Sequence, residues 1–201
     1  MSEEPHLIGV VVEGPSDQRT IPGLTDRILV CEVPGLEGHL EHARTFVGLG
    51  ATKPYLAWSD VAREVESGRV PRRHGHFGGE PGIEDAHTAV LALRCFVARE
   101  PQPAAVILVR DSDGKQKERM RGLEQAHKDG DWPFRVVLGV AHTMRECWVL
   151  AGFDPGTKSE TATLAALGKE LGFNPTKESN RLDASKETAK KSPKRVLSKL
   201  T

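Results

Sequence analysis

VVVEGPSD (residues 10–17) and VILVRDSDG (residues 106–114) are the two stretches that decide the fold of this chain. Each is an apolar, mostly β-branched run that leads into carboxylates beside a glycine. An apolar run bounded by turn residues predicts a buried strand. If the two strands are parallel neighbours in an α/β sheet, their acidic ends lie at its carboxyl edge, where such sheets place their sites. We therefore expect Glu13, Asp111 and Asp113 to meet in one crevice.

Three carboxylates that share a few ångströms raise each other's pKa, because like charges oppose ionisation. A hard divalent cation with oxygen ligands removes that penalty. Mg²⁺ is bound in this way by a few carboxylates together with waters and phosphates. The acidic ends of the two strands therefore predict a Mg²⁺ or Mn²⁺ site.

Strand and helix patterns alternate along the chain. The pattern predicts strands over residues 7–12, 28–33, 104–109 and 134–140, and the third is apolar on both faces, as a covered central strand should be. It predicts helices from Ser16 or Asp17, as the cap, to about residue 29, although Pro22-Gly23 breaks or delays this helix, and over 83–99 and 115–127. Strands separated by helices favour a mostly parallel four-stranded sheet with crossover helices, which is an α/β fold.

A chain of 201 residues is most simply one domain with additions. We expect a catalytic domain over 1–155, an insertion at about 36–82 that contains a helix at 56–65, and a helical, basic extension over 156–201. In the extension, Thr157 and Glu160 form a capping-box pattern for a helix to Leu171. Val196, Leu197 and Leu200 form an apolar stripe that suits docking.

Composition narrows the class of protein. The net charge is zero, so no global basic signature points to nucleic acid, but residues 151–201 hold 10 Lys/Arg against 6 Asp/Glu. No stretch has the length of about 20 apolar residues that spans a bilayer, and the N-terminus lacks a signal-peptide pattern. Three scattered cysteines suit reduced thiols, with Cys31 and Cys95 expected in the core. These features predict a cytoplasmic protein without membrane partners.

Residues 67–82 form a long loop that is rich in glycine and proline. Loops of this length are usually functional or disordered, so a solvated flexible loop is one interpretation. In the other, Arg72, Arg73, His74 and His76 contact a nucleic-acid backbone near the acidic crevice. His74 and His76 as a metal pair are a weaker alternative, because no third soft ligand stands nearby.

Glu146 and the cationic run at 186–195 are further candidates for the functional site. Glu146 follows the last strand and can reach the same edge, or it can serve only as a helix-start carboxylate that favours the helix dipole. Lys186 to Arg195 is a cationic run in which Lys190 and Lys191 are candidates for nucleic-acid binding. Such a run is a solvated face or a cationic wall beside the site.

The two acidic ends together resemble the Toprim domain. Glu13-Gly14 with Asp17 four residues after the glutamate, followed about a hundred residues later by Asp111-Ser-Asp-Gly114 after a strand, carry the resemblance. The Gly-Pro-Ser-Asp sequel and the segment 145–150 look most like the OLD-like nuclease branch, which includes small stand-alone proteins of bacterial and phage-defence loci. The resemblance covers roughly residues 7–155.

The resemblance implies a Mg²⁺- or Mn²⁺-dependent nuclease that acts on DNA or RNA, with two ions that hold the attacking and leaving oxygens. Glu13, Asp111 and Asp113 are the minimum set, and Asp17 and Glu146 are candidate ligands of the second ion. Glu13 is either a metal ligand or the general acid/base. OLD-like nucleases also use a lysine near the scissile phosphate, for which Lys194 is the first candidate and Lys158 the second; Lys158 is also a nucleic-acid contact candidate.

The chain has no Gly-x-x-x-x-Gly-Lys-Ser/Thr loop, so it departs from OLD proteins, which carry an ATPase domain. The resemblance therefore implies a separately encoded ATPase partner or none, and a homo-oligomer is a further candidate state. Gly14 and Gly114 are expected to permit tight turns and phosphate approach.

Three alternatives remain open. The carboxylates at the strand ends can be helix caps or a simple turn. The Asp-x-Asp pattern also occurs in phosphatases that phosphorylate the first aspartate, although the lysine and acidic pattern that such enzymes need downstream is not evident. A non-catalytic Toprim-like subunit, which binds metal or nucleic acid within a defence complex, is the alternative from another functional class.

Overall fold

The computed structural model describes residues 4–50, 53–69, 76–77, 80–81, 83–142 and 144–200. The chain forms two compact units, one of residues 1–111 with 115–140 and the other of 112–114 with 141–201. The first unit contains β1 (His6–Val12), α1 (Pro15–Glu32), α2 (Leu40–Ala43), β2 (Arg44–Val47), β3 (Leu56–Ala57), a 3-10 turn (Trp58–Asp60), α3 (Val61–Glu64), a π-helical turn (Val65–Arg69), β4 (His76–Phe77), β5 (Glu80–Pro81), α4 (Glu84–Val97), β6 (Ala105–Asp111), α5 (Gln116–Lys128) and β7 (Arg135–Ala141, whose last residue belongs to the second unit).

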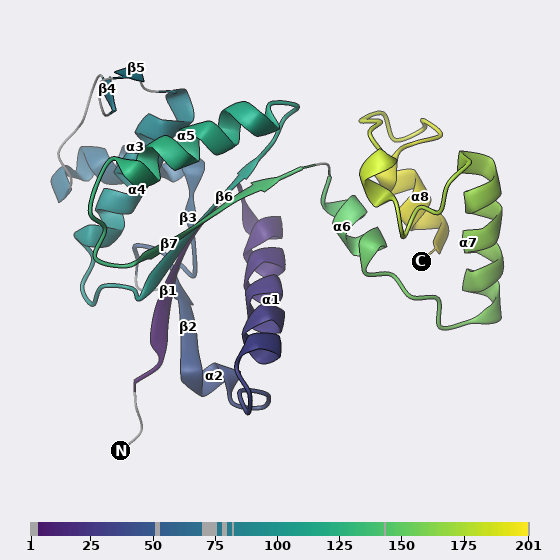
Figure 1. Ribbon diagram of the computed structural model, residues 1–201, viewed down its shortest axis with the longest axis horizontal. Coiled ribbons are helices and arrows are strands. Elements are labelled where there is room, and N and C mark those ends of the chain that lie inside the picture. The colour runs from purple at the N-terminus through teal and green to yellow at the C-terminus, as the bar shows by residue number, and fades with distance from the viewer. Residues whose placement is uncertain are drawn as a thin grey trace. The chain divides into compact units, whose positions relative to one another are not determined.

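The main sheet has the order β2-β1-β6-β7, and β3 also pairs with β1. β1 runs parallel to β2, to β3 and to β6. Helices α3, α4 and α5 lie on one face of this sheet and α1 lies on the other (Figure 1). The predicted α/β class with a parallel sheet between helices is therefore confirmed, but over the described residues this sheet has five strands rather than the four expected.

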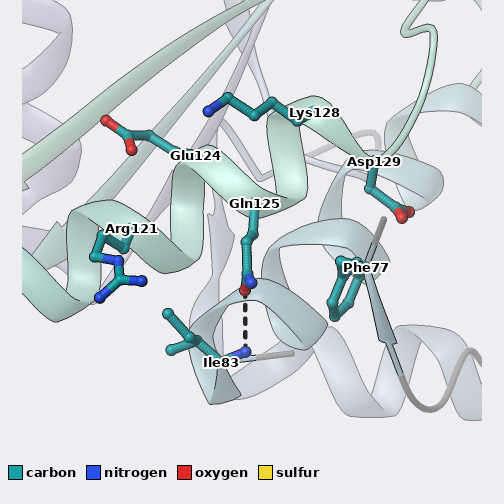
Figure 2. A pocket seen from close by; sticks show the side chains of 7 residues that line it. All are labelled: Phe77, Ile83, Arg121, Glu124, Gln125, Lys128 and Asp129. Carbon is teal, nitrogen blue, oxygen red and sulfur yellow. Dashed lines mark hydrogen bonds between the residues drawn. The ribbon is translucent and has the colours of Figure 1, made fainter. Parts of the chain in front are cut away.

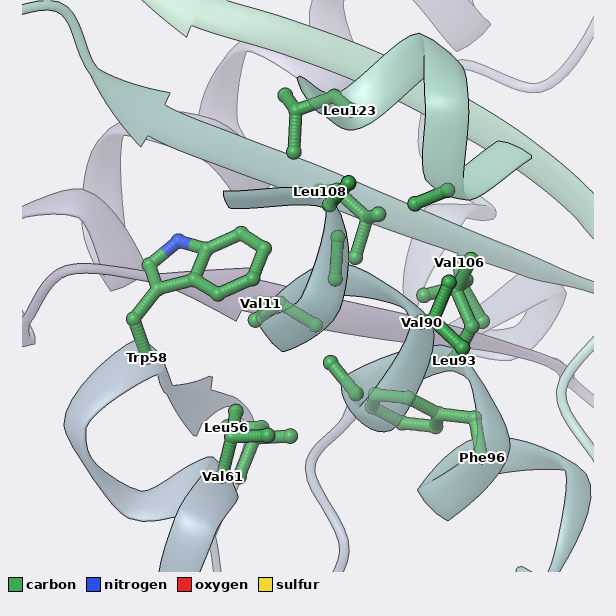
Figure 3. Packing of buried hydrophobic residues seen from close by; sticks show 14 of the residues in the cluster. Val11, Leu56, Trp58, Val61, Val90, Leu93, Phe96, Val106, Leu108 and Leu123 are labelled. Carbon is green, nitrogen blue, oxygen red and sulfur yellow. The ribbon is translucent and has the colours of Figure 1, made fainter. Parts of the chain in front are cut away.

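The core of the first unit lies between the sheet and α4. Val11, Val106 and Leu108 project from the two central strands and pack against Leu93 and Phe96 of α4 (Figure 3). The residues from Val106 to Val109 are all buried, as predicted for a central strand. Gly9 of β1 permits this packing, because a Cβ there would lie 2.7 Å from a ring carbon of Phe96. Burial of these apolar side chains is the main force that holds strand and helix together.

The first helix corrects two predictions. α1 runs without interruption through Pro22 to Glu32, so the expected strand at 28–33 is wrong. The apolar run there is short, and short apolar runs do not distinguish strand from helix. The cap is Gly14 rather than Ser16 or Asp17, and Pro15 takes the first helical position, where its missing N–H costs nothing.

The segment 36–82 is not an insertion beside the sheet, which corrects a third prediction. It supplies β2 and β3, which both pair with β1. The expected helix at 56–65 begins instead as β3 and becomes helical only from Trp58. Leu56, Trp58 and Val61 are all buried in the core, so the apolar spacing was set by packing rather than by one regular helix.

The second unit contains α6 (Arg145–Ala151), α7 (Lys158–Leu171), a 3-10 turn (Ser179–Arg181) and α8 (Pro193–Leu200). It begins earlier than the expected extension at 156. Its helices share an apolar core of their own that includes Leu150, Leu167 and Leu182. Val196 and Leu200 are buried in this core, which confirms the predicted docking stripe.

The ends of α7 also follow the prediction. The hydroxyl of Thr157 accepts a hydrogen bond from the Glu160 backbone, and the Glu160 carboxylate accepts one from the Thr157 backbone. Gly172 ends the helix in the left-handed conformation at φ 82°.

Cysteine placement differs in part from the prediction. Cys95 and Cys147 are buried, but Cys31 is exposed on α1, which corrects its assignment to the core. Among the helices that the structure describes, none combines the length and the apolar character needed to cross a bilayer.

Candidate functional site

Glu13 and Asp111 lie at the carboxyl ends of neighbouring parallel strands. Glu13 directly follows β1, and Asp111 is the last residue of β6. The strands pair with Val11 beside Leu108, so the same register continues to Glu13 beside Arg110, with Asp111 one residue beyond. The predicted convergence of these two carboxylates at one sheet edge therefore has its basis in the strand register.

Asp17 lies in the first turn of α1, close to the same strand end. Its carboxylate accepts a hydrogen bond from the backbone N–H of Gly14 at 3.2 Å. Gly14 itself is extended, at φ −171°, and a Cβ there would meet nothing within 4 Å. The expected tight turn at Gly14 is therefore not the reason for a glycine here, because any residue adopts an extended conformation.

Arg110 is the residue at this edge that sequence reasoning missed. Its Nη1 donates to Oε1 of Glu13 at 2.8 Å, and its Nε donates to Oδ1 of Asp85 at 2.9 Å. Arg110 interrupts the apolar run of β6 one residue before the Asp-x-Asp pattern. A cation in that position was the available signal, because a charge at the end of a buried strand needs a partner.

Asp85 anchors the network from α4. Its side chain is only 6% exposed and also accepts from Nη1 of Arg119 at 2.6 Å. Asp85 neutralises two arginines that are each 18% exposed, and charges this far from water need such pairing.

Trp58 holds Arg110 from a third side. The guanidinium carbon of Arg110 lies 4.9 Å from the centre of the Trp58 ring, within the range of a cation–π contact. The indole Nε1 of Trp58 donates to the backbone oxygen of Val109 at 2.7 Å. The tryptophan is therefore fixed to the strand that carries Arg110, and the arginine is held by two carboxylates and a ring.

Glu13, Asp17 and Asp111 supply carboxylate oxygens, which are the kind of ligand that a hard divalent ion prefers. The positions of these side chains, however, do not form a ready metal site. Over the part of the chain that the structure describes, no three His, Cys, Asp or Glu side chains are grouped so that they could hold a metal ion. Glu13 is instead paired with the cation that the chain itself supplies.

Asp113 and Gly114 belong to the second compact unit, together with Ser112. Both adopt left-handed backbone conformations, at φ 42° and 78°. Gly114 fits this requirement without strain, as predicted for that turn, and aspartate tolerates it better than most residues. Ser112 is buried, and its hydroxyl lies 3.3 Å from Nδ1 of His142 in the same unit.

Glu146 and Lys194 are both in the second unit, on α6 and α8. The ammonium of Lys194 donates to the Glu187 carboxylate at 2.9 Å. This hydrogen bond and the Glu187 charge raise the pKa of Lys194 above its usual value, and the charge of Glu146 adds a smaller increase. A lysine that stays protonated suits charge stabilisation rather than proton abstraction. Glu146 lies in the first helical turn, the position that the dipole alternative requires.

The basic residues that were predicted to contact nucleic acid are exposed wherever the structure describes them. Lys158 is exposed at the start of α7, and Lys190 and Lys191 are exposed before α8. His76 is exposed on β4, whereas Arg72, Arg73 and His74 lie outside the described residues.

A pocket of about 350 Å³ lies between α5 and residues near β4 and the start of α4, and none of the strand-end carboxylates lines it. Two cations, two anions, an amide and two apolar side chains line it: Arg121, Lys128, Glu124, Asp129, Gln125, Phe77 and Ile83 (Figure 2). The Gln125 side chain accepts from the Ile83 backbone at 3.1 Å. The balanced charges give this pocket no preference for a nucleic-acid phosphate.

Neither a known protein-family model, nor a curated protein, nor a solved structure matches this chain.

Proposed function

We propose that the first compact unit carries a nuclease site that hydrolyses phosphodiester bonds of nucleic acid with Mg²⁺ or Mn²⁺. One observation carries the proposal: Glu13 and Asp111 end two adjacent parallel strands, and Asp17 stands in the following helical turn. Open α/β sheets bind ligands at this edge. The resemblance of these residues to Toprim nucleases supports the same assignment.

Glu13, Asp17 and Asp111 would hold the ion. When bound, it would neutralise the phosphate oxygens as charge develops during hydrolysis. The protein's own contribution is an arginine at the same edge, since Arg110 is fixed beside Glu13 by Asp85 and Trp58. A fixed guanidinium stabilises phosphate charge at little cost in reorganisation.

A cleavage assay tests the proposal. Purified protein is incubated with supercoiled plasmid, linear duplex DNA and a structured RNA, in Mg²⁺, Mn²⁺ or EDTA. We expect metal-dependent cleavage that falls by about a hundredfold or more in Glu13→Gln and in Asp111→Asn. Asp131→Asn, which changes an exposed carboxylate before β7, should cleave as the unmodified protein does.

A second candidate function is a non-catalytic subunit of a defence complex. The observation that favours it is the ion pair between Glu13 and Arg110, which leaves the described residues without a ready metal group. This candidate predicts no cleavage of any of the three substrates. It also predicts retention of a protein partner, such as a separately encoded ATPase, when the chain is purified from its own cells.

A further inference from the structure

Arg110 makes two bonds of different character. Its Nε bond goes to Asp85, a buried carboxylate that Arg119 also holds. Its Nη1 bond goes to Glu13, whose side chain is 34% exposed. The Asp85 bond and the Trp58 ring contact anchor the guanidinium, whereas the Glu13 bond faces solvent and can exchange partners.

The two ligands of a nuclease site act on this exchangeable bond in opposite ways. A divalent cation at Glu13 repels the guanidinium, so Arg110 opposes metal binding. A phosphate is a strong bidentate acceptor for arginine, and it can replace Glu13 as the partner of Nη1. Each ligand then removes the obstacle to the other.

We propose that Arg110 is a gate on Glu13, which couples the binding of the divalent ion to the binding of nucleic acid. This inference rests on the proposed function and assigns to Arg110 a role in substrate and metal binding. In the resting protein the guanidinium neutralises Glu13. When a nucleic-acid phosphate accepts from Nη1, Glu13 becomes available to the cation. Because such coupling is reciprocal, the ion strengthens nucleic-acid binding by the same factor.

Arg119 provides a matched control. It donates to the same Asp85 oxygen as Arg110, and its side chain is equally exposed. Arg119→Gln therefore disturbs the buried carboxylate as Arg110→Gln does, while the Arg110–Glu13 pair is kept. A merely structural role for Arg110 predicts that the two variants behave alike.

The test measures Mn²⁺ affinity by calorimetry and by electron paramagnetic resonance, without an activity readout. The probes are Mn²⁺ alone and Mn²⁺ with a phosphorothioate oligonucleotide. In the unmodified protein we expect the oligonucleotide to raise Mn²⁺ affinity about tenfold, since removal of one nearby positive charge is worth at least that factor. Arg110→Gln should bind Mn²⁺ alone about tenfold more tightly, and the oligonucleotide should add little.

The control variants complete the test. Arg119→Gln should retain the unmodified affinity and coupling, and Glu13→Gln should lose Mn²⁺ binding. Arg110→Lys keeps the charge but cannot donate to Asp85 and Glu13 together as arginine does. Its Mn²⁺ affinity should therefore lie between those of Arg110→Gln and the unmodified protein. Thermal unfolding confirms that each variant is folded, and Arg110→Lys carries the test if Arg110→Gln does not fold.

Two outcomes separate the gate from the proposed function. If Arg110→Gln binds Mn²⁺ no more tightly than the unmodified protein, while Glu13→Gln abolishes binding, the gate is overturned and the metal site stands. If the unmodified protein binds no Mn²⁺ with or without the oligonucleotide, the metal-dependent function is overturned, and the gate with it.

Discussion

Asp85 in the first compact unit and Glu170 in the second each bind two cations, and the surroundings of the two carboxylates differ. Asp85 is 6% exposed and joins Arg110 to Arg119. Glu170 is 34% exposed and joins Arg195, at 2.5 Å, to Lys199, at 3.3 Å. A carboxylate between two cations is a structural necessity when it is buried, because the charges have lost their contact with water. At the surface the same arrangement contributes little to stability.

The difference also separates what each cluster can do. A buried anchor fixes Arg110 in one place, which a site needs in order to position a partner. An exposed pair between α7 and α8 only ties two helices that already share an apolar core. We therefore expect changes in the first unit to affect stability and binding together, and changes in the second to affect local stability alone.

The largest expected effect is that of Asp85→Ala. It leaves two poorly exposed arginines without this carboxylate, and loss of one partner from a buried pair costs about 3–5 kcal/mol. Urea unfolding, followed by the fluorescence of Trp58 in a Trp132→Phe/Trp148→Phe background, measures this loss. The free energy of unfolding of Asp85→Asn should lie between those of Asp85→Ala and the unmodified protein, because asparagine keeps an acceptor without the charge. A loss no larger than that of Glu170→Ala would contradict the comparison.

Trp58→Phe tests whether the Trp58 ring, which packs against Arg110, contributes to the stability of the buried Asp85 network. The substitution removes the indole donor to the buried Val109 oxygen, and an unsatisfied buried acceptor costs about 1–3 kcal/mol. Urea unfolding followed by circular dichroism gives the value. Trp132→Phe is the matched control, because the Trp132 indole donates to the His127 backbone at an exposed position. Equal losses in the two variants would show that the position of Trp58 is not special.

Thr157→Ala measures how much local helix capping stabilises the second unit. It removes the hydroxyl that accepts from the Glu160 backbone, and loss of such a cap costs about 1 kcal/mol. Thermal unfolding monitored by Trp148 reports this unit. Ser159→Ala, two residues later in the exposed first turn, should have a smaller effect. If both variants unfold as the unmodified protein does, the helix is held by its apolar face alone.

The smallest expected effect is the response of the second unit to acid. Hydrogen bonds from Arg195 lower the pKa of Glu170 below its ordinary value of 4.5, and the contact with Lys194 lowers that of Glu187 in the same direction. A depressed carboxylate pKa gives stability that is present above 4.5 and is lost as pH falls through the folded value. Melting temperatures between pH 6 and pH 2, read from Trp148, should fall less in Glu170→Gln/Glu187→Gln. If the melting temperature of the double variant depends on pH as that of the unmodified protein does, these ion pairs do not contribute to the loss of stability in acid.

Much of the fold could be predicted from local patterns. The run 106–109 and the helix at 84–97 were found because strong periodicity and flanking turn residues agreed. The pattern failed at 28–33, where a short apolar run belongs to α1. It also failed at 44–47, where a strand of only four residues pairs with β1 and lies inside the expected insertion. Short elements take their form from the neighbours that they pair with.

The candidate site was predicted in part. Glu13, Asp17 and Asp111 were proposed from the sequence because they follow two apolar strand patterns whose ends share one edge of a parallel sheet. Arg110 and Asp85 were not assigned to the site, because they stand 25 residues apart and only the packing of α4 against β6 brings them into contact. No local pattern records a pair of this kind.

The sequence by itself determined the buried run at 106–109, the approximate bounds of the helices at 84–97, 116–128 and 158–171, and the carboxylates that follow the two central strands. Those features depend on neighbours within a few residues, whose propensities and spacing are written in the chain. Only the tertiary structure decided that Glu13 faces an arginine rather than two other carboxylates. That outcome depends on strand register and on a buried aspartate from another element, and long-range pairing of charges is fixed by packing rather than by sequence spacing.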